Sequence, residues 1–395
     1  MSAIEVDLLQ ELRDRFQRVA IVHEWLTIPG GSEQVVLELL KMFPNAELFT
    51  SIYDPAPWPE AITGRPVHAS LLNRIPGASR NYRKLLPLMD RAYRAFDLSG
   101  FDLIISSNHA CAKNVRTPPG ALHVCYCYTP MRYAWEDDFR EGEDIGRLTR
   151  LALPLLLHRL RRQDLRGAAS PHAFVAISNH TANRIVRYYG RTAEVVNPPV
   201  DVEHFLALER APEDYYVVFG RVVPYKRVDL AVAACERLDR RLKVAGDGRA
   251  LQGIRTAAQG HDAIEFLGRV SDSERDSLLG GARALLFPGE EDFGIVPVEA
   301  QAAGVPVIAY GVGGATESVL DGLTGVLFGE QDARGLADAI ERFEHLELNE
   351  EQMRGNARRF GRERFHREMA EAIDTAWRAH AEASETHPRP SRTGS

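Results

Sequence analysis

"FPGEEDFGIVPVEAQAAGVPVIAYGVGGATESV", residues 287–319, is the stretch that decides the fold of this chain. It starts as an apolar strand ends, passes through an acidic turn and continues as a helix with a proline in its first turn, where proline is tolerated. Two carboxylates, Glu291 and Glu299, are separated by seven residues across this turn. A strand that leads through a tight turn into a helix is the repeating unit of a parallel α/β sheet. Ligands bind at the carboxyl ends of such strands, so both acids are candidates for a binding site.

Short apolar runs alternate with helical patterns on both sides of this stretch. Four runs in the first half predict buried parallel strands, at 18–25, 101–109, 122–128 and 173–179. Helical patterns occupy 31–43 and 180–190 in the same half. The alternation restarts at residue 215 and ends with a helix at 334–346. This repetition predicts two α/β domains.

The segment between the halves, residues 195–214, is polar and contains two prolines, which predicts a linker. We therefore expect an α/β fold with two Rossmann-like domains that face each other across a cleft. Their predicted bounds are 1–205 and 206–364. A long charged helix at about 365–385 is expected to cross back to the first domain, and the tail 386–395 is expected to be disordered.

Composition excludes several classes of protein. The 395 residues suffice for two domains, and 45% hydrophobic with 26% charged residues is the balance of a soluble globular protein. A net charge of −7 argues against general nucleic-acid binding, which needs a basic domain. The first sixteen residues carry acids and no apolar core, and no apolar run has the length of a membrane span. We expect a cytoplasmic protein that binds no nucleic acid.

The cysteines could suggest a metal or redox site. Cys125 and Cys127 alternate along an apolar run, but no second Cys/His pair has zinc-binding spacing. We therefore expect two small buried thiols and no bound metal.

A basic loop follows the first strand of the second half. Arg221 and Lys226 lie in "FGRVVPYKRVD", and two cations on a short loop before a helix suit a diphosphate. A solvated basic turn is an equal alternative for this loop alone. Val270 ends a later strand, where main-chain groups could meet a flat base.

The acidic turn is a more specific signal. The main-chain amides of Phe293, Gly294 and Ile295 precede a helix and suit an anion. Carboxylates accept hydrogen bonds from sugar hydroxyls, so Glu291 and Glu299 around an anion-binding turn suit a sugar, a diphosphate and a ribose. Glu299 alone could instead be an acid stabilised by the helix dipole.

Together, these motifs resemble glycosyltransferase family 4, whose fold is GT-B. The E-x7-E element, the F-x-R…K loop and the GG-x-x-E loop carry this resemblance, which extends over nearly the whole chain. Residues 23–50 and 106–135 resemble a narrower group, the mannosyltransferases of O-antigen and exopolysaccharide assembly, which typically use GDP-mannose.

The resemblance implies roles for the second domain. Glu291 would bind hydroxyls of the donor sugar, Glu299 those of the ribose, and Arg221 with Lys226 would neutralise the diphosphate. The remaining donor contacts would be made by the main chain of Val270, Phe293, Gly294 and Ile295.

It also implies roles for the first domain. Gly30 and Gly31 would let the main chain approach the diphosphate, and His109, at a strand end, would contact the donor sugar. A structural histidine is the alternative for His109. Lys113 would contact an acceptor phosphate. Tyr128 stands where the narrower group tends to have a histidine, and a phenol cannot exchange a proton near neutral pH as imidazole can.

The expected activity is a retaining transfer of mannose from GDP-mannose to a glycan acceptor. The alternatives are a UDP-sugar donor, hydrolysis or epimerisation of the donor alone, and an inert sugar-nucleotide binder. The chain contains no D-x-D element, so we expect no metal and no cofactor. Arginine- and leucine-rich stretches at 71–96 and 147–168 suit either an anionic membrane with a lipid-linked acceptor or ordinary helices with a solvated basic face.

Overall fold

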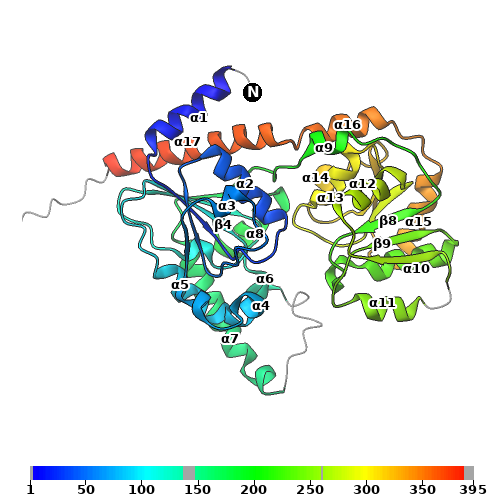
Figure 1. Ribbon diagram of the computed structural model, residues 1–395, viewed down its shortest axis with the longest axis horizontal. Coiled ribbons are helices and arrows are strands. Elements are labelled where there is room, and N and C mark those ends of the chain that lie inside the picture. The colour runs from blue at the N-terminus through cyan, green and yellow to red at the C-terminus, as the bar shows by residue number, and fades with distance from the viewer. Residues whose placement is uncertain (1–2, 137–146, 259–260, 387–395) are drawn as a thin grey trace, which may run out of the picture.

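Two parallel α/β domains lie side by side in the computed structural model, which describes residues 3–136, 147–258 and 261–386 (Figure 1). The first sheet has seven strands in the order β3-β2-β1-β4-β5-β6-β7, and the second has six in the order β10-β9-β8-β11-β12-β13. The expected pair of Rossmann-like domains is confirmed. The strands are β1 (Val19–His23), β2 (Glu47–Thr50), β3 (Val67–Ala69), β4 (Leu103–Asn108), β5 (Leu122–Cys127), β6 (Ala173–Ala176), β7 (Glu194–Val195), β8 (Tyr216–Phe219), β9 (Leu242–Ala245), β10 (Ile264–Gly268), β11 (Ala284–Phe287), β12 (Val307–Tyr310) and β13 (Gly325–Phe328).

Helices cover both faces of each sheet. In the first domain they are α1 (Ala3–Arg15), α2 (Gly31–Met42), α3 (Glu60–Thr63), η1 (Leu71–Arg74), α4 (Ala78–Asn81), η2 (Tyr82–Leu85), α5 (Leu86–Arg94), η3 (Ala112–Asn114), α6 (Arg132–Trp135), α7 (Arg147–Ala168) and α8 (Asn179–Tyr189). From the linker onward they are α9 (Val202–Leu206), η4 (Pro224–Lys226), α10 (Val228–Leu238), α11 (Leu251–Ala257), α12 (Asp272–Gly281), α13 (Ile295–Ala302), α14 (Ala315–Ser318), α15 (Ala333–Glu344), α16 (Glu350–Arg358) and α17 (Arg362–Thr386). None of the described helices is long and apolar enough to span a bilayer.

The central strands are buried on both faces, which explains their continuous apolar sequences. Every residue of β1, β4, β5, β8 and β11 is buried. Parallel strands covered by helices on both sides have this character. The four strands expected in the first half correspond to β1, β4, β5 and β6, whereas β2 and the two edge strands β3 and β7 were not predicted.

The segment between the sheets is more ordered than a linker. Residues 195–214 contain α9, and its Phe205 is only 2% exposed, in the same core cluster as Val298 of α13. The predicted linker did not include this helix, because the proline-rich composition hid two apolar anchors, Val202 and Phe205.

The C-terminal helix crosses back to the first domain as expected. Residues 359–361 separate the helices α16 and α17, and α17 then runs along the first domain beneath α1 (Figure 1). Arg15 of α1 forms an ion pair with Asp374 at 2.9 Å, and Phe16 packs edge-on against Trp377. The predicted disordered tail, 386–395, lies outside the described residues except for residue 386.

Candidate active site between the two domains

A cation and a carboxylate meet at the carboxyl edge of the second sheet. Lys226 Nζ donates a hydrogen bond to Glu291 Oε1 at 2.5 Å, and the side chains are 16% and 21% exposed. Lys226 follows β8 and Glu291 follows β11, which is the neighbouring strand. Gly289 permits the contact, because a Cβ there would lie 2.7 Å from the Lys226 Cα. Two sequence-predicted residues, 65 positions apart, thus form one charged pair.

Arg221 joins this pair from the same loop. It is exposed, and its Nη2 lies 3.5 Å from the hydroxyl of Tyr225, the residue before Lys226. The loop therefore presents two cations at one strand end, a fitting arrangement for a diphosphate.

The turn after Glu291 offers main-chain donors. Gly294 adopts a left-handed conformation (φ 85°) and caps the start of α13. Among the residues that the structure describes, no hydrogen bond is made by the amides of Phe293, Gly294 or Ile295. Free amides at the start of a helix attract an anion.

The last two glycines of "GVGG", residues 311–314, pack against the main chain of this turn. The amide of Gly314 donates to the Glu291 carbonyl at 2.8 Å, and a Cβ at Gly314 would lie 2.2 Å from the Phe293 Cα. A side chain at this position would displace the main chain that carries the anion-binding amides. The loop is glycine-rich because it packs main chain against main chain.

Glu299 lies farther along α13 and has different neighbours. It is partly buried, and burial raises the pKa of its carboxyl to about 7, partly offset by Arg275 and reinforced by Asp276 of α12. Val270 lies partly buried just before α12 and packs on the same core as Ile295. The two acids of the E-x7-E element therefore face different surroundings, Lys226 for Glu291 and α12 for Glu299.

Sequence reasoning missed Glu24, which shapes the first-domain side of the site. This fully buried carboxylate accepts hydrogen bonds from the amides of His109, Ala110, Cys111 and Ala112, at 2.7 to 3.1 Å. Its position directly after the buried strand β1 was the available signal, since an acid there lies at the carboxyl edge of the sheet.

His109 itself follows β4 and is partly buried. Its ring centroid lies 4.6 Å from that of Trp25 and 6.3 Å from that of Tyr128. Burial lowers the pKa of the imidazole, and this effect exceeds the opposing influence of the Glu24 carboxylate. Burial of the ring thus favours the neutral imidazole.

Tyr128 secures the glycine turn of the first domain. Its hydroxyl donates to the Ser32 carbonyl at 2.9 Å and lies 2.8 Å from Ser107 Oγ. Burial raises the pKa of this phenol well above its usual value, so it stays protonated. Tyr128, which stands where the narrower group tends to have a histidine, thus helps to position the turn at Ser32.

The same turn meets the second domain. A Cβ at Gly31 would lie 2.9 Å from Ile295 Cδ1, so the start of α2 approaches the start of α13. Gly30 caps α2 in an extended conformation (φ −164°) that other residues also adopt. Gly31, rather than Gly30, is the position where the main chain of the first domain comes close to the Ile295 side chain of the second.

Lys113 does not reach this site. It is fully buried, with Nζ 2.5 Å from Asp164 Oδ1 and 2.9 Å from the Ala110 carbonyl, and the Asp164 carboxylate raises its pKa against the effect of burial. Its expected contact with an acceptor phosphate is therefore unsupported, because the ammonium group already has a buried partner. Trp135 also bonds to Asp164, through Nε1 at 2.7 Å.

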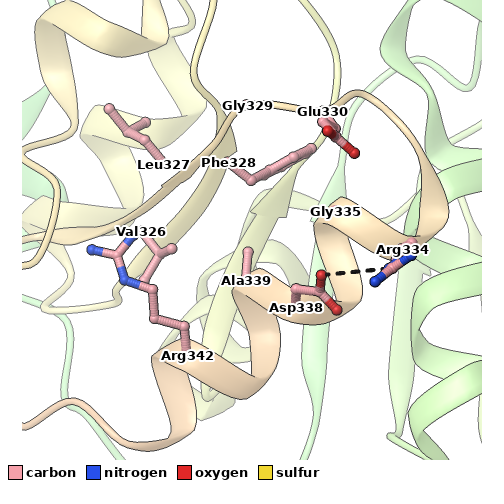
Figure 2. Close-up of a pocket in the computed structure, with 10 residues that line it drawn as sticks. All are labelled: Val326, Leu327, Phe328, Gly329, Glu330, Arg334, Gly335, Asp338, Ala339 and Arg342. Atoms are coloured by element: carbon pink, nitrogen blue, oxygen red, sulfur yellow. Dashed lines mark ion pairs between the residues drawn. The ribbon is translucent and has the colours of Figure 1, made fainter.

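A separate cavity of about 500 Å³ lies between β13 and α15 (Figure 2). Its rim is charged, and Arg334 and Asp338 form a long ion pair of 3.9 Å there. None of the candidate site residues lines it.

Within the described residues, no group of three or more His, Cys, Asp or Glu side chains is suited to a metal ion, and Cys125 and Cys127 are buried thiols.

Comparison with known proteins matches both domains to glycosyltransferases. Residues 29–204 match the family model described as Glycosyltransferase Family 4, and residues 201–360 match that described as Glycosyl transferases group 1. The uncharacterized glycosyltransferase MJ1178 of Methanocaldococcus jannaschii is 31% identical over 193 residues, which are 48% of this chain and 53% of that protein. The chain thus matches only about half the length of this curated relative.

Solved structures confirm the GT-B fold. The lipopolysaccharide outer core galactosyltransferase WaaB superposes with a TM-score of 0.63 at 16% identity, over 92% of this chain and 99% of its own. Anabaena Alr3699/HepE in complex with UDP-glucose superposes with a TM-score of 0.57 at 16% identity, over 93% and 99%.

Proposed function

We propose that this chain, whose two domains each match a glycosyltransferase family model, transfers a sugar from a nucleoside-diphosphate donor to a glycan acceptor. The observation that carries the proposal is the Lys226–Glu291 pair at 2.5 Å, beside the amides at the start of α13. A cation, free amides and a carboxylate at one sheet edge match the phosphate and hydroxyl groups of an activated sugar.

The donor would lie along the second domain. Arg221 and Lys226 neutralise the diphosphate together with the amides of the α13 start, Glu291 accepts hydrogen bonds from the sugar, and Glu299 from the ribose. The main chain at Val270 meets the base. Because fixed cations and amides supply the positive charge, the proposed reaction is metal-independent.

The proposed transfer retains the configuration at the anomeric carbon. The bond from that carbon to the diphosphate oxygen breaks, and the acceptor hydroxyl attacks from the same face. The departing phosphate takes the proton of the acceptor hydroxyl, so no separate base is required. His109 and the carboxylate of Glu291 hold the sugar in place during this step.

We propose mannose from GDP-mannose as the donated sugar. Its support is the resemblance of residues 23–50 and 106–135 to O-antigen and exopolysaccharide mannosyltransferases. A UDP-sugar is the second candidate, since HepE, a protein of the same fold, was crystallised in complex with UDP-glucose.

The proposed acceptor is lipid-linked and is met at the inner face of the cytoplasmic membrane. Exposed leucines and exposed cations occur together on η1 to α5 and on α7, at one end of the first domain (Figure 1). The large exposed apolar residues there are Leu71 (73%), Ile75 (40%), Leu88 (45%), Leu155 (75%) and Leu165 (43%). Basic surfaces that carry apolar side chains bind anionic lipid headgroups.

A panel of nucleotide sugars tests the activity. The purified chain is incubated with GDP-mannose, UDP-glucose and UDP-galactose, with and without a polyprenyl-diphosphate-linked glycan. We expect GDP-mannose to raise the melting temperature most and to be consumed only when acceptor is present. Consumption without acceptor would identify a hydrolase or an epimerase, and consumption of no donor would contradict the proposal.

A further inference from the structure

Asp292 stands inside the proposed donor site but faces the other domain. It lies between Glu291 and the amide-bearing turn. Its Oδ1 accepts a hydrogen bond from Arg184 Nη1 at 2.6 Å, and its Oδ2 lies 2.8 Å from Arg132 Nη2. Its carbonyl accepts from Ser178 Oγ at 2.5 Å. All three partners belong to the first domain.

The two arginines are shared with an acid of their own domain. Glu136 Oε2 lies 3.6 Å from Arg132 Nε, and the other oxygen of Glu136 contacts Arg184. The four side chains are only 10–25% exposed. Burial alone would raise the pKa of Asp292. Arg132 and Arg184 lower this pKa by more than burial raises it, so the carboxylate is charged. Two cations and two anions thus compensate each other across the domain boundary.

A second contact holds the loop behind Asp292. Glu317 follows the glycines that pack on residues 291–293, and its Oε2 accepts from Asn179 Nδ2 at 3.0 Å. Its Oε1 accepts from the amide of His180 at 3.3 Å. The start of α8 therefore contacts residues 291–294, called the donor loop below, through Ser178, and it contacts Glu317 of α14 behind that loop.

The same network reaches the basic loop. The guanidinium carbon of Arg132 lies 5.7 Å from the ring centroid of Tyr225, the neighbour of Lys226. Arg221 also approaches the hydroxyl of Tyr225. Arg132 is therefore in contact with both loops that form the proposed diphosphate site.

We propose that Asp292 is a positioning residue, and that its ion pairs with Arg132 and Arg184 form an interdomain latch that keeps the donor loop in its working arrangement. The proposal deepens the assigned function and rests on it for its kinetic consequence. When the domains separate, the loop loses three first-domain partners and Glu291 is no longer held opposite the acceptor side. Small displacements of reacting groups cost much of the rate.

The latch is tested by measuring the separation of the domains without any substrate. Spin labels are attached at Asp97→Cys and Glu341→Cys, one exposed site on each domain, since the four native cysteines are buried. Asp292→Asn removes the charge at constant size. Asp214→Asn is the matched control, because Asp214 forms an exposed pair with Arg283 at 3.0 Å. Near-ultraviolet circular dichroism checks that both variants are folded.

We expect Asp292→Asn to lengthen and broaden the distance distribution, and Asp214→Asn to leave it unchanged. Arg184→Gln, which breaks the contact from the other domain, should give the same change and add little to Asp292→Asn. In the transfer assay, kcat/KM should fall about 10- to 100-fold for Asp292→Asn and recover in part for Asp292→Glu.

Two outcomes separate the latch from the activity. Distances that are identical in the wild type and in both latch variants would overturn the latch, whatever the kinetics. Longer distances in a protein that uses no nucleotide sugar would uphold the latch and overturn the proposed function.

Discussion

Glu24 accepts hydrogen bonds from four consecutive amides, and this contact fixes the turn that carries His109. Glu24→Gln replaces the carboxylate by an amide that cannot accept them all. We expect the free energy of unfolding to fall by about 1.5–3 kcal/mol, the range for hydrogen bonds to charged groups. Urea denaturation measures this loss. Glu47→Gln, on a partly exposed acid, is the control, and an equal effect of both changes would contradict the account.

The Glu299 carboxyl predicts a pH dependence of stability. Burial raises its pKa to about 7 in the folded state, above its ordinary value of 4.5. Between these two pH values the unfolded chain has released the proton and the folded chain has not. Stability therefore falls as the pH rises through this window and levels off above it. Urea titrations from pH 4.5 to 8 should show this decline in the wild type and a smaller one in Glu299→Gln. The same decline of stability with pH in the wild type and in Glu299→Gln would show that the pKa of this carboxyl is not raised.

For single residues, the sequence predicted which charged side chains stand at strand ends better than it predicted which of them are buried. Glu291 and Lys226 were each expected at a strand end, and the structure makes their two strands neighbours. Lys113 also follows a strand, but its partner Asp164 is 51 residues away on α7. Pairings of that kind depend on how helices pack and have no local sequence signal.

The loop before α14, residues 311–314, requires glycine at position 314 because it packs directly against the main chain of residue 293. Because a Cβ at Gly314 would lie 2.2 Å from the Phe293 Cα, Gly314→Ala should push the donor loop out of place. We expect donor affinity, measured by isothermal titration calorimetry, to fall at least about tenfold, a change of roughly 1.4 kcal/mol. Gly253→Ala in α11 is the matched control, since a Cβ there meets nothing within 4 Å. Unchanged affinity in Gly314→Ala would contradict the packing argument.

The basic end of the first domain predicts binding to anionic vesicles. Arg80 and Lys84 are exposed on α4 and η2. Each basic residue near an anionic surface contributes about 1 kcal/mol, so reversing both charges should weaken binding at least about tenfold. Co-sedimentation with phosphatidylglycerol vesicles measures this effect, and Arg237→Glu with Arg255→Glu is the control on the second domain. Equal binding by all proteins, or binding only to neutral vesicles, would refute the membrane contact.

At the element scale, long apolar runs gave reliable strands and short edge elements did not. β4 and β5 were expected from apolar runs, and all six residues of each strand are buried. β3 has three residues, none fully buried, and β7 has two, so neither has a hydrophobic pattern. Their existence depends on a neighbouring strand that is already in place.

For the whole molecule, the repeated alternation of strands and helices predicted two sheets, and a long charged helix predicted the return of α17. The relation between the domains was expected only as a cleft. The contacts that define it, such as Asp292 with Arg132 and Arg184, join residues more than 100 positions apart. Only the assembled fold brings them together.

In the proposed reaction both domains act on one activated sugar, through His109 of the first and Glu291 of the second. A double-mutant cycle of His109→Ala and Glu291→Gln on kcat/KM for sugar transfer tests it most directly. We expect each change alone to lower kcat/KM at least about 100-fold, and the double variant to lose less than the product of the two, with a coupling above about 1 kcal/mol. Losses that multiply independently, or a full rate in either single variant, would contradict it.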